Sequence, residues 1–307
     1  TGQFKAINTG GAPIGTWSSG GSLNTEGFQL FGFGTQTAAI RAGGYDSTYQ
    51  NNAENYNGTS WTALATLNDA RSNEAGAGSG TATAGLIYGG NSPPRTANTE
   101  SWNGSAWTEV NDLNTARSNV SGVGTSTASL AFFGQDAPGS SGYTGKTESW
   151  NGSSWTEVAD GNTARGGGTG VGQVYTAALM VGGYSTATSS ANEVWDGSSW
   201  TESGDLNTGR NNGMSRGGTS TDGIIAGGYQ STGPSTGYKA NTELFNGSTW
   251  TEIADLATAR YALGGQGTTS NSAIAFGGIT PASDPAGVTA TEEFTGADFL
   301  IKSVTTS

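Results

Sequence analysis

Residues 98 to 109 read Asn-Thr-Glu-Ser-Trp-Asn-Gly-Ser-Ala-Trp-Thr-Glu, and the sequence Leu113-Asn-Thr-Ala-Arg117 follows shortly afterwards. This stretch recurs along the chain, because five tryptophans stand 45 to 50 residues apart in one register: Trp61, Trp107, Trp155, Trp200 and Trp250. Seven residues before each stands a glutamate: Glu54, Glu100, Glu148, Glu193 and Glu243. Ten residues after each stands an arginine: Arg71, Arg117, Arg165, Arg210 and Arg260. A degraded sixth copy starts at Glu292 and has Phe299 in the tryptophan position, so the period predicts an array of similar units.

Each repeat also carries a short apolar run that ends in glycine, such as Gly85-Leu-Ile-Tyr-Gly89-Gly90. These runs are too short for helices and are bounded by Gly, Ser, Thr and Asn, which end strands. The element Glu-x-aromatic alternates with the period of a strand, and the following Asn-Gly supplies the positive φ angles of a tight hairpin. We therefore predict four short antiparallel strands in each repeat.

Four-stranded units at this spacing are typical of a β-propeller, and six copies predict six blades. Glycines suit the crowded strands near the axis, and the repeated aromatic residues would fill the space between sheets. The segment Gly15-Thr-Trp17 matches the end of a repeat, so we expect a terminal strand to close the ring. Trp17 fits this place better than Phe299. The expected organisation is a segment 1–17 that closes the ring or lies along an outer edge, a propeller over 18–304, and a tail over 305–307.

This combination of features resembles the kelch family of β-propellers. The resemblance rests on the glycine pair after an apolar strand, the acidic-x-aromatic element, the tryptophan and the downstream arginine, over about residues 17–304. The motifs Asn-Gly-Ser-x-Trp-Thr and Leu-Asn-Thr-Ala-Arg are also similar to motifs in kelch-type proteins of marine phages. The resemblance implies an all-β, six-bladed kelch-type propeller and suggests a viral context.

Composition excludes several classes of function. The 307 residues contain no His and no Cys, which rules out disulfides and Ser-His-Asp or Cys-His catalytic groups. A formal net charge of −12 argues against a nucleic-acid partner, and no apolar run approaches the length of a membrane span. No residue pattern indicates a catalytic, metal or cofactor site, and we expect none.

The registered arginines allow two interpretations. In the first, Arg71, Arg117, Arg165, Arg210 and Arg260 form a ring of guanidinium groups near the channel mouth and bind a carboxylate or an acidic glycan. In the second, each arginine pairs with a registered glutamate or stacks on a registered tryptophan, and repetition in every blade favours this structural role. We expect the registered glutamates and tryptophans, together with Trp17, to be structural.

The segments after the glycine pairs differ most between repeats: 45–51, 91–97, 135–145, 184–191, 229–240 and 279–289. They hold the candidate contact residues Tyr45, Tyr49, Arg95, Tyr143, Tyr184, Tyr229 and Tyr238. Tyrosine together with Ser and Gly makes adaptable contact surfaces. Because each segment joins the second strand of a repeat to the third, we predict that they share one face and that this face contacts a partner. The alternative is that they are solvated connectors.

These observations favour a non-enzymatic recognition or structural module, a virion appendage or surface-decoration protein on a virion or extracellular surface. Its expected partners are other virion or surface proteins or a host-surface glycan, and a homo-oligomer is compatible with the sequence. One alternative is a polysaccharide-active enzyme that uses a pair of carboxylates, although no spacing singles out such a pair. Another is an intracellular kelch adaptor, although such proteins usually carry further domains.

Overall fold

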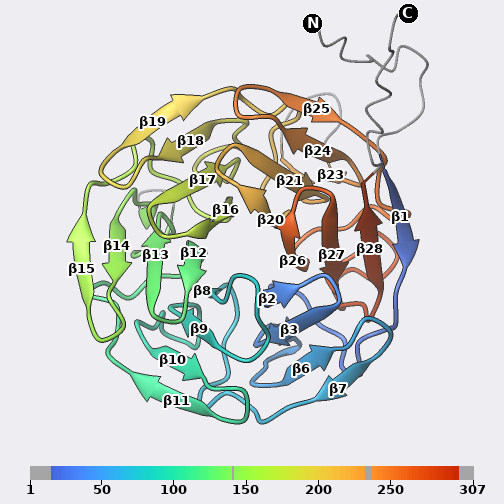
Figure 1. Ribbon diagram of the computed structural model, residues 1–307, viewed down its shortest axis with the longest axis horizontal. Coiled ribbons are helices and arrows are strands. Elements are labelled where there is room, and N and C mark those ends of the chain that lie inside the picture. The colour runs from blue at the N-terminus through green and yellow to red at the C-terminus, as the bar shows by residue number, and fades with distance from the viewer. Residues whose placement is uncertain (1–14, 140–141, 232–236, 297–307) are drawn as a thin grey trace, which may run out of the picture.

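The computed structural model describes residues 15–139, 142–231 and 237–296, without the side chains of residues 215–217. Six four-stranded antiparallel sheets surround a central axis, with one strand of each sheet beside the axis and one at the rim (Figure 1). The prediction of an all-β, six-bladed propeller is therefore confirmed. The described part of the chain contains no helix that is long and apolar enough to span a bilayer.

Each blade runs outward from a strand beside the axis to a strand at the rim. In that direction, blade 1 comprises β2 (Phe31–Thr35), β3 (Ala38–Ala42), β6 (Ala53–Tyr56) and β7 (Trp61–Ala63). Blade 2 comprises β8 (Ala75–Ala77), β9 (Gly85–Tyr88), β10 (Thr99–Trp102) and β11 (Trp107–Val110). Blade 3 comprises β12 (Ser121–Thr125), β13 (Ala128–Phe132), β14 (Thr147–Trp150) and β15 (Trp155–Val158). Blade 4 comprises β16 (Thr169–Val174), β17 (Ala177–Val181), β18 (Asn192–Trp195) and β19 (Trp200–Ser203). Blade 5 comprises β20 (Met214–Thr219), β21 (Asp222–Ala226), β24 (Thr242–Phe245) and β25 (Trp250–Glu252). Blade 6 comprises β26 (Gly264–Thr269), β27 (Ser272–Phe276), β28 (Thr291–Thr295) and β1 (Thr16–Ser19).

The ring is closed within blade 6, where β1 from the start of the chain pairs antiparallel with β28. Trp17 lies opposite Phe294 in this pairing, and their ring centroids are 5.2 Å apart. Closure by a terminal strand is confirmed, and it joins the two ends of the propeller through backbone hydrogen bonds. Phe299, the competing candidate, and the expected tail over 305–307 lie outside the described residues.

The outer-strand tryptophans pack between neighbouring blades. Trp155 of blade 3 meets Tyr88 of blade 2 edge-on, with ring centroids 4.7 Å apart. Its Nε1 donates a hydrogen bond to Thr99 Oγ1, also in blade 2, at 3.3 Å. Trp61 bridges blades 1 and 6 in the same way, contacting Phe276 and donating to Thr291 Oγ1 at 3.1 Å. Both indoles therefore fill an apolar gap, and one polar contact fixes the orientation of each.

The hairpins between third and fourth strands share one turn chemistry. In blade 2, Asn103 Oδ1 accepts hydrogen bonds from the backbone N–H groups of Ser105 and Ala106, both at 3.0 Å. The intervening Gly104 adopts a φ of 95°, which a side chain would oppose. Asp196 accepts the same two hydrogen bonds in blade 4, and these bonds lower the pKa of its carboxyl to about 2. The Asn-Gly turns predicted from the sequence thus set the register of the outer strands.

Candidate functional site

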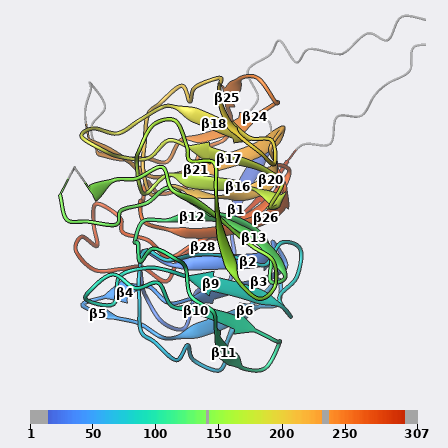
Figure 2. The same cartoon turned by 90° about the vertical axis from the view of Figure 1, so that its left-hand side faces the viewer.

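Chain connectivity gives the disc two different faces. The connections between second and third strands and those between blades lie on one face, which we call the loop face, and the hairpins lie on the other. Figure 2 shows the disc edge-on, with the loops that carry β4 (Tyr45–Asp46) and β5 (Thr48–Tyr49) projecting on the left. A second short strand pair, β22 (Tyr229–Gln230) and β23 (Gly237–Tyr238), orders the loop of blade 5. The sequence did not predict either of these pairs.

The registered arginines do not lie on this face as free cations. Their side chains are buried, each with at most 1% of its surface exposed, and each forms an ion pair with the glutamate of the following repeat. The pairs are Arg71–Glu100, Arg117–Glu148, Arg165–Glu193, Arg210–Glu243 and Arg260–Glu292. This geometry opposes the hypothesis that these arginines form a ligand-binding ring, because their guanidinium groups face carboxylates and carbonyls between the strands.

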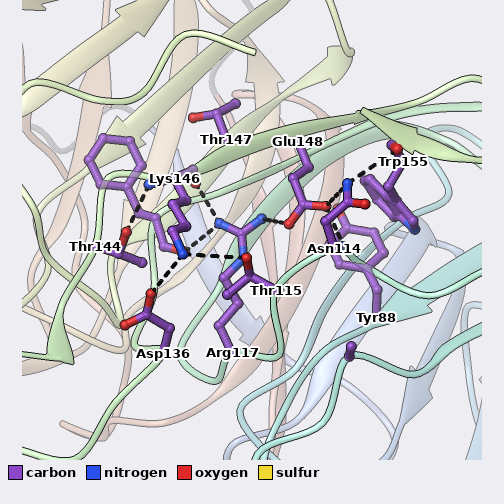
Figure 3. A network of polar contacts seen from close by, with 12 residues as sticks. Tyr88, Asn114, Thr115, Arg117, Asp136, Thr144, Lys146, Thr147, Glu148 and Trp155 are labelled. Atoms are coloured by element: carbon purple, nitrogen blue, oxygen red, sulfur yellow. Dashed lines mark hydrogen bonds and ion pairs between the residues drawn. The ribbon is translucent and has the colours of Figure 1, made fainter. Parts of the chain in front are cut away.

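Blade 3 shows what the pair does (Figure 3). Arg117 donates to Glu148 Oε1 at 2.8 Å and to the backbone oxygen of Phe133 at 3.1 Å. Glu148 Oε2 accepts hydrogen bonds from the backbone N–H and the Nδ2 of Asn114, at 2.7 and 2.9 Å. Asn114 Nδ2 also donates to the backbone oxygen of Trp155 at 3.2 Å. The Asn-x-x-Arg segment that enters a blade is thereby tied to its second, third and fourth strands.

Burial lowers the pKa of Arg117, and the charge of Glu148 and the hydrogen bond to it act in the opposite direction. The same balance lowers the pKa of Arg210 and Arg260. A buried ion pair of this kind costs desolvation on both sides, so it persists only where further hydrogen bonds satisfy both groups. Backbone carbonyls accept from the arginines, and backbone N–H groups of the connector donate to the glutamates. The Asn side chain adds a bond to the glutamate in blades 1, 2, 3 and 5. In blade 4, Asn162 Nδ2 donates, among the described residues, only to the backbone oxygen of Trp200, and in blade 6 Ala257 replaces Asn.

Blade 1 reaches the same arrangement with a residue that the repeat pattern missed. Gly27 occupies the registered arginine position there, and Arg41 from β3 supplies the guanidinium group instead, 3.3 Å from Glu54. Arg41 donates to the backbone oxygens of Gly43 and Asn52, the counterparts of those that Arg71 contacts in blade 2. A charged residue inside an otherwise apolar strand was the sequence signal for this role.

A repeated backbone frame carries variable side chains across the loop face. In every blade, the first residue after the glycine pair (which is replaced by Phe133-Gly134 in blade 3) exchanges two backbone hydrogen bonds with the residue after the registered arginine position. The six pairs are Phe28–Tyr45, Ser72–Asn91, Ser118–Gln135, Gly166–Tyr184, Asn211–Tyr229 and Tyr261–Ile279. Backbone geometry is therefore nearly constant around the face, and the chemistry varies from blade to blade.

The structure brings six of the predicted loop tyrosines into two separate groups. One group spans blades 5, 6 and 1, where Tyr229 and Tyr238 pack against Tyr261, and Tyr45 packs against Phe28 and Tyr49. Tyr238 donates to Asp284 Oδ2 at 2.6 Å, and burial followed by this bond raises the pKa of its hydroxyl. Sequence reasoning missed Phe28 and Tyr261, although Tyr261 directly follows a registered arginine.

The second group lies between blades 3 and 4. The ring centroids of Tyr143 and Tyr184 are 6.0 Å apart, and both rings line an open cleft of about 430 Å³. Arg95, the other predicted contact residue, lies beside this group and donates to Gln135 Oε1 at 2.8 Å and to Ser118 Oγ at 3.1 Å. The structure thus places Arg95 in a supporting position.

A smaller cavity of about 110 Å³ lies on the axis, where the inner strands begin. Six residues surround its mouth with positive φ angles and a closed circle of backbone hydrogen bonds, from 2.6 to 3.3 Å long: Gln29, Asn73, Asn119, Gly167, Asn212 and Ala262. Asn and Gly tolerate this left-handed conformation best, which explains most of the residues in the circle. Among the described residues, no group of three or more acidic side chains could hold a metal ion.

Comparison with known proteins supports the architecture and adds no chemistry. No protein-family model matches the chain, and no curated protein does. The chain is similar to a solved structure described as "Structure of YjhT", with a TM-score of 0.74 and 13% sequence identity, over 91% of this chain and 97% of that one. The likeness shows a shared propeller fold. Membership of the kelch family and the likeness to phage proteins stay predictions.

Proposed function

We propose that this protein is a non-enzymatic recognition module that contacts its partner through the loop face. The observation that carries the proposal is the repeated hydrogen-bonded frame, which presents different side chains in each blade at equivalent positions. Conserved geometry with variable side chains is how rigid scaffolds usually display binding loops. The β-propeller fold supports binding in general terms.

The finer part of the proposal concerns where the module acts. We propose a virion appendage or surface-decoration protein, located on a virion or another extracellular surface, whose partners are other virion proteins or a host-surface glycan. The similarity of the repeat motifs to those of phage proteins supports this setting, and the net charge of −12 bears on the partner. The charge is the reason why a nucleic-acid partner is not proposed.

The absence of an enzymatic role is part of the same proposal. Each registered glutamate is engaged by an arginine and by backbone N–H groups of the preceding connector, as in the pairing of Glu148 with Arg117 and Asn114. A carboxylate held this way is neither free to donate a proton nor placed opposite a second catalytic carboxylate, as glycoside hydrolysis requires.

Two experiments on the 307-residue chain test the proposal. The protein is incubated with a glycan array and, separately, used as bait against the disrupted particles of a phage that encodes it. Binding to a glycan or to a virion protein is the expected result, and it should weaken when the residues of the loop face that touch the ligand are replaced. Release of reducing sugar from a polysaccharide, with no binding in either assay, would overturn the proposal in favour of an enzyme.

A further inference from the structure

The cleft between blades 3 and 4 differs from the rest of the loop face. It is lined by Gln135, Gly139, Tyr143, Tyr184, Ser185 and Thr186, and its volume of about 430 Å³ falls in the range of small-molecule sites. We call it the tyrosine cleft. Two aromatic rings and several short polar side chains therefore converge on a concave surface.

The two rings are held in place by their neighbours. Their planes are inclined at 67°, so one ring turns its face toward the edge of the other. Tyr143 packs directly on Gly166, where an added Cβ atom would lie 3.1 Å from ring carbon Cδ1. Gly166 exchanges two backbone hydrogen bonds with Tyr184 at 2.8 and 2.9 Å. One small residue thus positions both tyrosines, which reduces the entropy that a ligand must remove on binding.

The hydroxyl groups distinguish this pair from the other loop tyrosines. Tyr45 donates to the backbone oxygen of Ser47, Tyr49 accepts from Asn91 Nδ2, and Tyr238 donates to Asp284. Among the described residues, the hydroxyls of Tyr143 and Tyr184 have no such partner. The Tyr229 hydroxyl has none either, but its ring is packed against two further tyrosines. The tyrosine cleft therefore offers two rigid rings whose hydroxyls are available to a ligand.

The remaining polar group of the cleft is oriented from outside. Arg95 donates to Gln135 Oε1 at 2.8 Å, and Gln135 Nε2 donates to the backbone oxygen of Gly139 at 2.9 Å. These bonds decide which way the amide points and leave one Nε2 hydrogen for a further acceptor. Arg95 directs its donors at the neutral side chains of Gln135 and Ser118, so its positive charge stays behind Gln135 and outside the lining of the cleft.

Charge defines the class of ligand. None of the six lining residues is acidic or basic. The nearby Asp136 carboxylate is neutralised by Lys146, whose Nζ lies 3.1 Å from Asp136 Oδ2. Burial raises the pKa of the Tyr143 hydroxyl, so it stays a neutral donor. An uncharged ligand with apolar faces and many hydroxyls fits such a site, because its C–H faces pack on the rings and its hydroxyls exchange hydrogen bonds with the polar groups.

We propose that the tyrosine cleft binds a residue of a neutral saccharide, with Tyr184 and Tyr143 as the packing surface and Gln135 as a polar contact. This inference rests on the proposed recognition function and assigns the glycan contact to one place on the loop face.

The test measures affinity for defined neutral probes. Maltohexaose, cellohexaose, chitohexaose and mannohexaose are titrated calorimetrically into the full chain, with a heparin hexasaccharide as the acidic comparison. Tyr184→Ala is expected to weaken binding of the best neutral probe about tenfold or more, which corresponds to about 1.4 kcal/mol. Tyr143→Phe, which retains the ring and removes only the hydroxyl, should weaken it about threefold to tenfold.

Tyr45→Ala is the matched control, because Tyr45 occupies the register position of Tyr184 in another blade. It should leave the dissociation constant unchanged, and thermal melting of all variants checks that they fold. If Tyr45→Ala weakens neutral-glycan binding and Tyr184→Ala does not, the cleft assignment is overturned but the recognition function stands. Binding of heparin alone, or of a virion protein with no glycan, likewise overturns the cleft assignment only. If the protein binds no glycan and no virion protein, both the cleft assignment and the proposed recognition function are overturned.

Discussion

Glu74 provides the most demanding test of the packing between blades 1 and 2. It stands three residues after Arg71, at the position that Val120 and Leu263 occupy in other blades. Its carboxyl group faces Gly43, just as Val120 and Leu263 face the equivalent glycines. Only 8% of Glu74 is exposed, and neither carboxylate oxygen has a hydrogen-bond partner among the described residues. An ionisable group therefore occupies an apolar slot between two blades.

Burial raises the pKa of Glu74 from 4.5 to about 8, although the charges of Arg71 and Arg41 act in the opposite direction. The folded state then binds more protons than the unfolded state between these two pH values, so stability falls as the pH rises through this window. Relative to low pH, the raised pKa of Glu74 lowers the unfolding free energy by about 3 kcal/mol at pH 7, where the folded carboxyl is still mostly protonated and the unfolded one is ionised. The loss reaches about 5 kcal/mol well above pH 8, where the carboxyl is ionised in both states. Below pH 4 the cost vanishes, because the carboxyl is protonated in both states.

The test substitution is Glu74→Gln, which keeps the shape of the side chain and removes its ionisable carboxyl group. Chemical denaturation of the wild type and the variant at pH 5, 7 and 9 should show the variant gaining stability relative to the wild type as the pH rises. The expected gain from pH 5 to pH 9 is about 4 kcal/mol. Glu157→Gln, on the exposed side of β15, controls for the change in net charge and should show no such trend. A stability difference that does not change with pH would refute the reasoning.

Three further substitutions test the repeat. Ala53→Thr places a hydroxyl where Trp107 Nε1 lacks a hydrogen-bond partner among the described residues. In denaturant titrations it should raise the unfolding free energy by about 1 kcal/mol. No gain would mean that the Trp107 indole N–H already has a partner. Arg210→Met should lower the unfolding free energy by about 3–5 kcal/mol, because it leaves the Glu243 carboxylate buried and unpaired. A loss of less than about 1 kcal/mol would indicate that the ion pair is exposed to solvent. Trp17→Ala should cost about 3 kcal/mol in thermal unfolding, and an unchanged melting temperature would contradict closure of the ring by β1.

The repeat pattern was sufficient to predict the blades. Blades 1 to 5 are built from contacts that are close in sequence, such as the Asn103-Gly104 turn between β10 and β11, and only blade 6 takes a strand from the other end of the chain. The number of repeat copies gives the number of blades. Closure was predictable for the same reason, since Trp17 restores the missing end of a repeat. The short pairs β4–β5 and β22–β23 were not predicted, because their sequences carry no strand alternation of useful length.

The candidate site was predictable in position and not in chemistry. The variable segments pointed to Tyr143, Tyr184 and Arg95 as contact residues. The packing of the two tyrosines depends on Gly166, which lies in the connection between blades 3 and 4 and not in a variable segment. The registered arginines presented the opposite difficulty. Their spacing was evident, yet the sequence left open whether guanidinium groups at that register face solvent or the glutamate of the next repeat.

The amino-acid sequence by itself determined the strand pattern, the number of blades and the absence of His and Cys chemistry, because periodicity and composition are local properties of the chain. Only the tertiary structure decided that Arg41 substitutes for the missing registered arginine, that Glu74 lies in an apolar slot, and that two tyrosines from neighbouring blades share a cleft. Burial and pairing arise when residues distant in sequence meet, and the free energy of such a meeting depends on the groups that surround both partners.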